Sequence, residues 1–327
     1  MSDGGITILD GNTLRSLHVS LPEDTVTLTG AQVLDFAESE ASQSLLGISL
    51  PPHLKSSALR RMNIDGVDDV TSFQLTELSQ EQASRKLSDY LSAIADELKD
   101  DPLVVSILDG NALRMFLEDE DDFAMIAENL FTDLDTEDKG KIGKSEIRNA
   151  VVHMGVDMGV PPLEEFPLLN DILKKHGVEE EGELGQSQFA ELLQPVIQEL
   201  ADALAKKHVA VIHKIKIVNG SEIRKVLAEE KKLNDAIAKA LQGKHKNDQK
   251  STEIIRDFLE KNGKELGLPP SEANEAVILL YDAVFTDIDS GRDASIEEDE
   301  FRKLVREILE KFAEQLQANP VYCDLDG

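Results

Sequence analysis

The chain has 327 residues and a formal net charge of −30, from 64 acidic and 34 basic side chains. This charge excludes the nucleic-acid-binding class, which needs a basic surface, and it excludes a surface held on anionic lipid. It favours basic protein partners or metal ions instead. The hydrophobic fraction of 41% is enough to build packed cores, so we expect a folded chain.

Cysteine content and hydropathy bear on the compartment. Cys323 is the single cysteine, so neither an intrachain disulfide nor a thiolate zinc cluster is expected. The first residues lack the basic start and apolar run of a signal peptide, and no stretch approaches the roughly 18 apolar residues of a membrane helix. We therefore expect a soluble protein of the cytoplasm, with the nucleus left open and no membrane partner.

The sequence repeats itself. A Leu-Asp-Gly-Asn segment at 9–12 recurs at 108–111 and, more loosely, as Val-Asn-Gly-Ser at 218–221. A pair of prolines follows each copy, at 51–52, 161–162 and 269–270. Two independent markers with nearly constant spacing indicate repeated supersecondary units. The sequence therefore predicts three modules, with boundaries at 1–106, 107–216 and 217–327.

The apolar residues within a module follow a helical period. They recur at intervals of three and four, which is typical of amphipathic helices with one buried face. The last helix of the second module shows the pattern best, with Phe189, Leu192, Leu193, Val196, Ile197, Leu200 and Leu204. We predict an all-α fold in which each full module contains two helix–loop–helix units, with short strands pairing the loops.

The loop at 135–146 carries oxygen ligands at intervals suited to Ca²⁺. A twelve-residue calcium loop supplies ligands from positions 1, 3, 5, 7, 9 and 12, with glycine at position 6 for the sharp turn. Asp135, Glu137 and Glu146 fall at positions 1, 3 and 12, and Lys141 would offer its backbone carbonyl at position 7.

Three further residues of this loop bear on the prediction. Gly140 takes the turn position, and Ile142 at position 8 would pair with a sister loop as a short strand. Lys139 is the departure, because at position 5 it replaces an oxygen ligand with a cation. This substitution should weaken calcium binding.

A second candidate calcium loop lies at 289–300. Ala294 replaces its turn glycine, and a positive φ there costs alanine about 1 kcal/mol relative to glycine. Gly291 supplies no side chain at position 3, so a water must replace that ligand. The candidate ligands are Asp289, Asp293, Glu297 and Glu300 through their carboxylates, and Ser295 through its carbonyl.

The sister loops of the second and third modules depart further from the calcium pattern. The sister loop at 177–188 keeps a glycine and the strand residue Leu184, but Gly177 and Gln188 stand where acids should be. We interpret it as vestigial, with Glu179–Glu181 forming a solvated acidic turn or holding a cation loosely. The degraded sister near 243–254 is short and carries lysines, at Lys244, Lys246 and Lys250.

The first module has departed furthest from the pattern. Leu21 comes only 10 positions after Gly11, so the helix that should enter the first loop has no room. Its loops, at 21–32 and 66–77, keep the strand residues Leu28 and Phe73 but lack an acid at the first position. We expect this module to be structural.

These features together resemble a known family. Paired helix–loop–helix units behind a Leu-Asp-Gly segment, with Phe189 and Phe301 opening the helices that follow the loops, are similar to plant EF-hand calcium-binding proteins of the calmodulin superfamily. The resemblance covers about 107–327 and is weak over 1–106. It implies tandem EF-hand pairs, Ca²⁺ as the ligand, and a sensor role through protein partners, protein kinases among them.

Two functional hypotheses remain open. The first is a calcium-responsive regulatory protein, with an affinity on the order of 10⁻⁵–10⁻³ M because the ligand sets are imperfect. The second is an EF-hand-like interaction scaffold that needs no calcium. An enzyme is not expected, because no nucleophile, paired base or cofactor loop is visible. The basic stretch 224–250 is either a solvated helix face or a docking strip for acidic partners or acidic neighbours in the chain.

Overall fold

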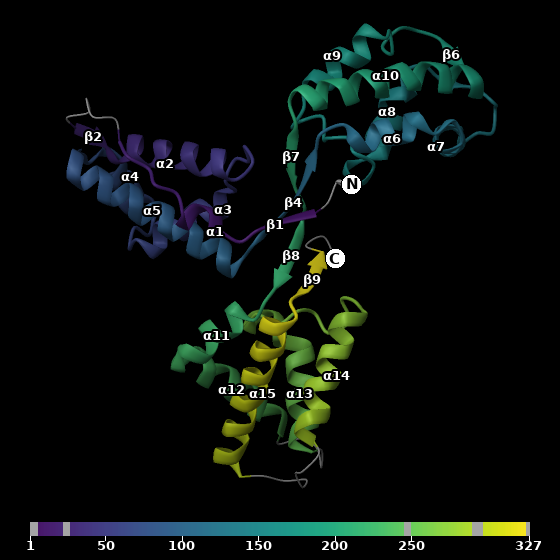
Figure 1. Cartoon of the computed structure of the whole chain (residues 1–327). Coiled ribbons are helices and arrows are strands. Elements are labelled where there is room, and N and C mark those ends of the chain that lie inside the picture. Colours follow the sequence, from purple (N-terminus) through teal and green to yellow (C-terminus); the bar gives the residue numbers. More distant parts are fainter. Residues whose placement is uncertain (1–5, 22–26, 245–249, 290–296, 325–327) are drawn as a thin grey trace. The chain divides into compact units, whose positions relative to one another are not determined.

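The computed structural model describes residues 6–21, 27–244, 250–289 and 297–324, and for Gly243, Lys244 and Asp289 it describes the backbone alone. These residues are mostly helical with a few short strands, so the prediction of a broadly helical fold is confirmed (Figure 1). Within the described ranges, no helix combines the length and the apolar character that a membrane-crossing segment needs.

The chain divides into two compact units, each built from separate segments. Unit 1 comprises Met1–Ile8, Glu38–Leu50 and Val105–His213. Unit 2 comprises Leu9–Ala37, Pro51–Val104 and Lys214–Gly327. One hydrophobic core in unit 1 draws its buried residues from 108–211, and one in unit 2 draws them from 218–323. The boundaries of the three predicted modules stay a prediction.

The second module contains two helix–loop–helix units whose loops are joined by a pair of short strands. Helix α10 packs against α6, α7, α8 and α9 and is therefore the central helix of this core (Figure 1). The elements are β4 (Leu103–Leu108), α6 (Asn111–Glu118), α7 (Glu120–Leu134), β5 (Ile142–Gly143), α8 (Glu146–Met154), η1 (Val156–Met158), α9 (Leu168–Lys175), β6 (Glu183–Leu184), α10 (Gln186–Lys206) and β7 (Val209–Ile212).

In the third module, helices α11 to α15 surround a separate hydrophobic core. The last helix, α15, packs against α11, α12 and α14, and strands β8 and β9 pair antiparallel beyond its C-terminal end (Figure 1). The buried Tyr281 hydroxyl donates a hydrogen bond to the carbonyl of Pro269, one of the marker prolines, at 3.2 Å. The elements are β8 (Ile215–Val218), α11 (Ser221–Ala228), α12 (Glu230–Lys244), α13 (Ser251–Asn262), η2 (Gly263–Leu266), α14 (Glu275–Asp289), α15 (Glu298–Ala318) and β9 (Val321–Asp324).

The first module has no helix entering its first loop within the described residues, as its sequence predicts. Residues 16–21 are not helical, so the entering helix of the first loop is absent from this described stretch. The elements are β1 (Ile6–Leu9), α1 (Asn12–Arg15), β2 (Thr27–Thr29), α2 (Gly30–Ser44), α3 (Pro52–Arg61), α4 (Val67–Leu75), β3 (Glu77–Ser79) and α5 (Gln80–Asp100). Strands β1, β4 and β7 form one sheet in that order.

The repeated Gly-Asn and Gly-Ser segments have one structural role. Each glycine lies between a strand and the helix that follows it, and is the N-cap residue of that helix. The backbone of the glycine is in the left-handed conformation, with φ of 79° at Gly11, 83° at Gly110 and 77° at Gly220. In the first two copies the following asparagine donates to the preceding aspartate, which closes the turn. The repeat found in the sequence is therefore a repeated strand-to-helix junction.

Candidate functional site

The loop that follows α7 is organised around Asp135. The carboxylate of this residue accepts hydrogen bonds from the backbone N–H groups of Lys139, at 2.9 Å, and Gly140, at 2.7 Å. Gly140 has a φ of +67°, which glycine adopts at little cost. The sharp turn predicted at position 6 is therefore present, and the first predicted ligand residue holds it in place.

Two short strands join this loop to its sister. Ile142 pairs with Leu184, and the N–H of Lys144 donates to the carbonyl of Gly182 at 2.9 Å. The Ile142 side chain is buried in the same core as Phe131 and Phe189, whose rings meet edge to face at 5.7 Å. The predicted pairing of the residues at position 8 of both loops is confirmed.

The other predicted ligands of this loop already have partners. Glu137 forms an ion pair with Lys139, and both side chains are 67% exposed. Glu146 is the first residue of α8 and accepts a hydrogen bond from the Asn149 amide at 2.7 Å. Among the residues that the structure describes, no three His, Cys, Asp or Glu side chains are gathered as a metal would need.

The sister loop at 177–188 is tied to the first loop by ion pairs. Lys144 Nζ lies 2.9 Å from Glu180 Oε2, and Arg148 Nη2 lies 3.2 Å from Glu179 Oε1. The Glu180 carboxylate folds back so far that a Cβ on Gly177 would lie 2.9 Å from its oxygen. The space beside Gly177, the first residue of the sister loop, is thus occupied by the Glu180 carboxylate, which pairs with the Lys144 ammonium group. Two of the three glutamates are paired as well as solvated.

The predicted ligands of the third-module loop are only partly described. Asp293 and Ser295 lie outside the described residues, and Asp289 is the last residue of α14, described by its backbone. Glu297 is the N-cap residue of α15, without a side-chain cap, and Glu300 is exposed in the first helical turn. Helices α14 and α15 flank this loop as predicted.

The degraded loop predicted near 243–254 is short, as its sequence indicates, because helices occupy both of its ends. Gly243 and Lys244 still belong to α12, and residues 251–254 belong to α13. Ile254 and Ile255 are buried, since they begin the apolar face of α13. A twelve-residue loop therefore does not fit between these helices; Lys246 lies outside the described residues, and Lys250 is the N-cap of α13.

The second loop of the first module is also corrected. Leu28 pairs with Leu78, whereas the predicted strand residue Phe73 lies in α4. The N–H of Gly30 donates to the carbonyl of Thr76 at 3.0 Å, as Lys144 does to Gly182 in the second module. This correspondence places the loop at 71–82, five residues later than predicted. The sequence signal was the Ser79-x-x-Gln82 capping box at the start of α5.

Three loops end on a glutamine whose side chain accepts a backbone N–H group at the start of the following helix. Gln32, Gln82 and Gln188 all stand at position 12 of their loops once the register is corrected. Each side-chain oxygen accepts the backbone N–H three residues earlier, from Thr29 at 2.9 Å, Ser79 at 3.0 Å and Gly185 at 3.1 Å. In these loops the last side chain satisfies a backbone donor and offers no carboxylate to a metal.

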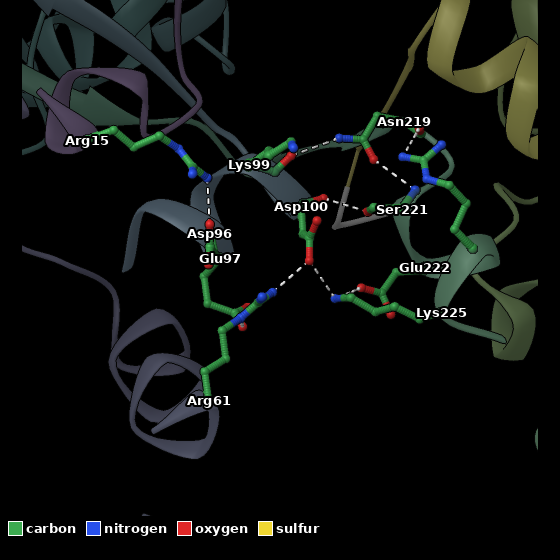
Figure 2. A network of polar contacts seen from close by, with 11 residues as sticks. Arg15, Arg61, Asp96, Glu97, Lys99, Asp100, Asn219, Ser221, Glu222 and Lys225 are labelled. Carbon is green, nitrogen blue, oxygen red and sulfur yellow. Dashed lines mark hydrogen bonds and ion pairs between the residues drawn. The ribbon is translucent and has the colours of Figure 1, made fainter. Parts of the chain in front are cut away.

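A separate polar network within unit 2 was not predicted (Figure 2). It joins the C-terminal end of α5 to the start of α11. The carbonyl of Lys99 accepts from the Asn219 amide at 3.2 Å, and that of Asp100 accepts from the Ser221 hydroxyl at 2.8 Å. Side chains from α11 and the residues before it thus satisfy carbonyls that the end of α5 leaves without helical partners.

Charged side chains strengthen this network (Figure 2). The Asp100 carboxylate lies 2.6 Å from Arg61 Nη2 and 3.0 Å from Lys225 Nζ. Burial alone would raise the pKa of the Asp100 carboxyl, but the hydrogen bonds from Arg61 and Lys225 outweigh it and lower the pKa below its ordinary value. Lys225 belongs to the basic stretch 224–250, so part of that stretch faces acidic neighbours in the chain.

The chain was also compared with other proteins. No family model matches it, and no curated protein or solved structure matches it either. The geometry of the loops is therefore the basis for any statement about function.

Proposed function

We propose that the chain is a calcium-binding regulatory protein of the EF-hand type, which acts through calcium-modulated contacts with protein partners. The proposed binding site is the loop at 135–146, whose residues are all described. The loop at 289–300 is its counterpart in the third module, on the strength of its ligand sequence. A protein kinase is a candidate partner through the family resemblance alone.

The observation that carries this proposal is the turn held by Asp135. Its carboxylate bonds to the N–H groups of Lys139 and Gly140, with Gly140 at positive φ, and the Ile142–Leu184 pair follows directly. A calcium loop needs this chain path to bring its ligands together. Asp135, Glu137 and Glu146 supply hard oxygen donors, which Ca²⁺ prefers. The donor set fits the ion in type, and Glu146 has to release Asn149 to join it.

Calorimetric titration of the full chain with CaCl₂ tests the proposal. We expect weak binding, with a Kd on the order of 10⁻⁵–10⁻³ M. Glu146→Gln and Glu300→Gln each remove the carboxylate that closes a shell, so each variant should lose one component of the heat. Gln188→Glu serves as a control in the vestigial loop. If the parent chain gives no calcium heat, the proposal is wrong.

A second function is favoured by the three capping glutamines. Gln32, Gln82 and Gln188 complete their loops without a cation, and Lys144 supplies a positive charge to the sister loop. These contacts support an EF-hand-like interaction scaffold that keeps its shape without calcium.

Thermal unfolding separates the two functions. A ligand that binds the native state alone stabilises it by about 2.7 kcal/mol at one hundred times its Kd. A regulatory protein should therefore melt at a higher temperature in CaCl₂ at about one hundred times its calorimetric Kd than in chelator, and MgCl₂ at the same concentration serves as the ionic control. A scaffold should melt at the same temperature in all three solutions.

A further inference from the structure

We propose that helix α4 is a docking surface for a basic, amphipathic segment of a protein partner. This surface lies in the first module and outside the calcium loops, so the inference goes beyond the proposed function. The sequence predicts a structural loop at 66–77, whereas the structure makes Val67–Leu75 a helix. No residue of α4 is buried, although every other helix of eight or more residues within the described ranges buries at least one side chain.

The apolar side chains of α4 are exposed to solvent. Val67 is 81% exposed and Leu75 is 75% exposed, and these are the two highest values among the large hydrophobic side chains that the structure describes. With Thr71 between them they recur every four residues, so the three form an apolar strip along one side of the helix. The Thr71 hydroxyl donates to the Val67 carbonyl at 2.7 Å and is therefore already satisfied.

The opposite side of α4 holds the helix only at its C-terminal end. Val70 and Phe73 are partly buried, and the Phe73 backbone lies so close to Gly30 that a Cβ there would be 2.0 Å from the Phe73 carbonyl oxygen. A helix of nine residues is marginal in water, because most helical stability comes from packing an amphipathic face. A partner that covers the apolar strip would supply the packing that the module leaves out.

The charge around α4 favours a basic partner. Residues 62–84 contain no lysine, arginine or histidine. Asp68 and Asp69 lie in the first turn of α4, and neither takes part in an ion pair among the described residues. Asp68 follows Val67 directly, so negative charge borders the apolar strip. Complementary charge attracts a basic segment, whereas a second copy of the same acidic helix is repelled.

Tryptophan fluorescence tests the proposal on the full chain. The chain contains no tryptophan, so a peptide with a single tryptophan gives the binding signal. The probe is a synthetic peptide of about 18 residues, with leucine and the tryptophan on one helical face and lysine on the other. A peptide of the same composition in scrambled order has the same charge but no apolar face. Titrations in chelator keep the calcium loops out of the measurement.

A pair of double variants isolates the apolar strip. Val67→Ala with Leu75→Ala removes most of the exposed apolar surface of α4, and alanine has the higher helix propensity, so the helix is retained. Ile278→Ala with Leu279→Ala is the matched control. Its two side chains are 45% and 60% exposed on α14, which also carries acidic residues and no basic ones. Circular dichroism melts establish that each variant is folded.

We expect the parent to bind the amphipathic peptide about tenfold more tightly than the scrambled peptide. The α4 variant should lose this difference, and the α14 control should keep it. Equal binding by the parent and the α4 variant would show that the peptide does not dock on α4. Equal binding of the two peptides would show that charge alone accounts for the contact. Either result, or a parent that binds neither peptide, overturns the proposal.

The charge of the partner is tested separately. Asp68→Asn with Asp69→Asn should weaken binding of the amphipathic peptide about threefold. Asp121→Asn with Asp122→Asn changes two acids in the first turn of α7 and should leave the affinity at the parent value. Equal effects of the two changes would contradict a basic segment seated on α4. Sedimentation of the parent as a dimer and of the Val67→Ala, Leu75→Ala variant as a monomer would assign the surface to a second copy instead.

Discussion

The Cα atom of Gly110 lies directly against the backbone of Ala201. A Cβ at position 110 would be 2.2 Å from the Ala201 carbonyl oxygen, closer than any real contact. Gly11 meets Ala95 and Gly220 meets Ala313 in the same way, at 2.4 Å and 2.7 Å. Two separate reasons therefore require glycine at this strand-to-helix junction of each module. The φ angle is positive, and the backbone of the last long helix packs directly against the junction.

Gly110→Ala should lower the free energy of unfolding of unit 1 by about 2–4 kcal/mol, from left-handed strain together with the steric clash. Urea denaturation followed by circular dichroism measures the change. Gly47→Ala is the matched control, since Gly47 has a φ of +81° but no atom within 4 Å of the added Cβ. It should cost about 1 kcal/mol, from strain alone. Equal effects in the two variants would exclude the clash.

The order of helices and loops in the second module was predictable, because apolar periodicity and turn chemistry act over a few residues. Ile142 could be matched to Leu184 because both stand at position 8 of their loops, and the structure pairs them. In the first module the same rule predicted Phe73 as the strand residue, because the shortened sequence does not show where the second loop begins. The structure shows that Leu78 is the buried strand residue and that Phe73 belongs to helix α4.

The polar network between α5 and α11 could not be predicted. Asp100 and Lys225 are separated by more than one hundred residues, and neither belongs to a motif. Their contact depends on how whole helices pack, which local patterns do not specify. The ion pairs of the sister loop were missed for a related reason. Glu180 lies close to Gly177 and pairs with Lys144, a contact that depends on the folded path of both loops.

Asp100 makes the stability of unit 2 depend on pH. The pKa of its carboxyl is lower in the folded chain than in the unfolded chain. Its stabilising effect is therefore complete above the ordinary pKa of aspartate and disappears as pH falls through the lower folded value. At neutral pH, Asp100→Asn should reduce the free energy of unfolding by about 1–2 kcal/mol.

Urea denaturation at pH 7 and at successively lower pH tests this expectation. The difference between parent and Asp100→Asn should shrink in the acid range, because the protonated parent resembles the variant. Asp235→Asn, an exposed change in α12, serves as the control. A difference that stays constant down to pH 2 would show that the Asp100 charge contributes nothing.

The Ile142–Leu184 pair should matter for stability through Ile142. That side chain is 6% exposed in the core, whereas Leu184 is only partly buried. Ile142→Ala should cost about 2–4 kcal/mol, and Leu184→Ala clearly less, because the cost follows the buried volume that is removed. Thermal melts of both variants in chelator measure the intrinsic effect. A larger loss for Leu184→Ala would contradict the burial argument.

Gln188→Glu should leave both stability and calcium binding unchanged. Glutamate also accepts the Gly185 N–H, so the helix cap survives the change. The new carboxylate completes position 12 of the sister loop, yet Gly177 still offers no ligand at position 1 and Glu180 stays paired with Lys144. A closing carboxylate without the opening one does not make a calcium shell. Calorimetry should show no heat beyond that of the parent. An additional binding event would contradict this expectation. It would mean that the ion pair of Glu180 and Lys144 opens readily and that the loop holds an ion without a side-chain ligand at position 1.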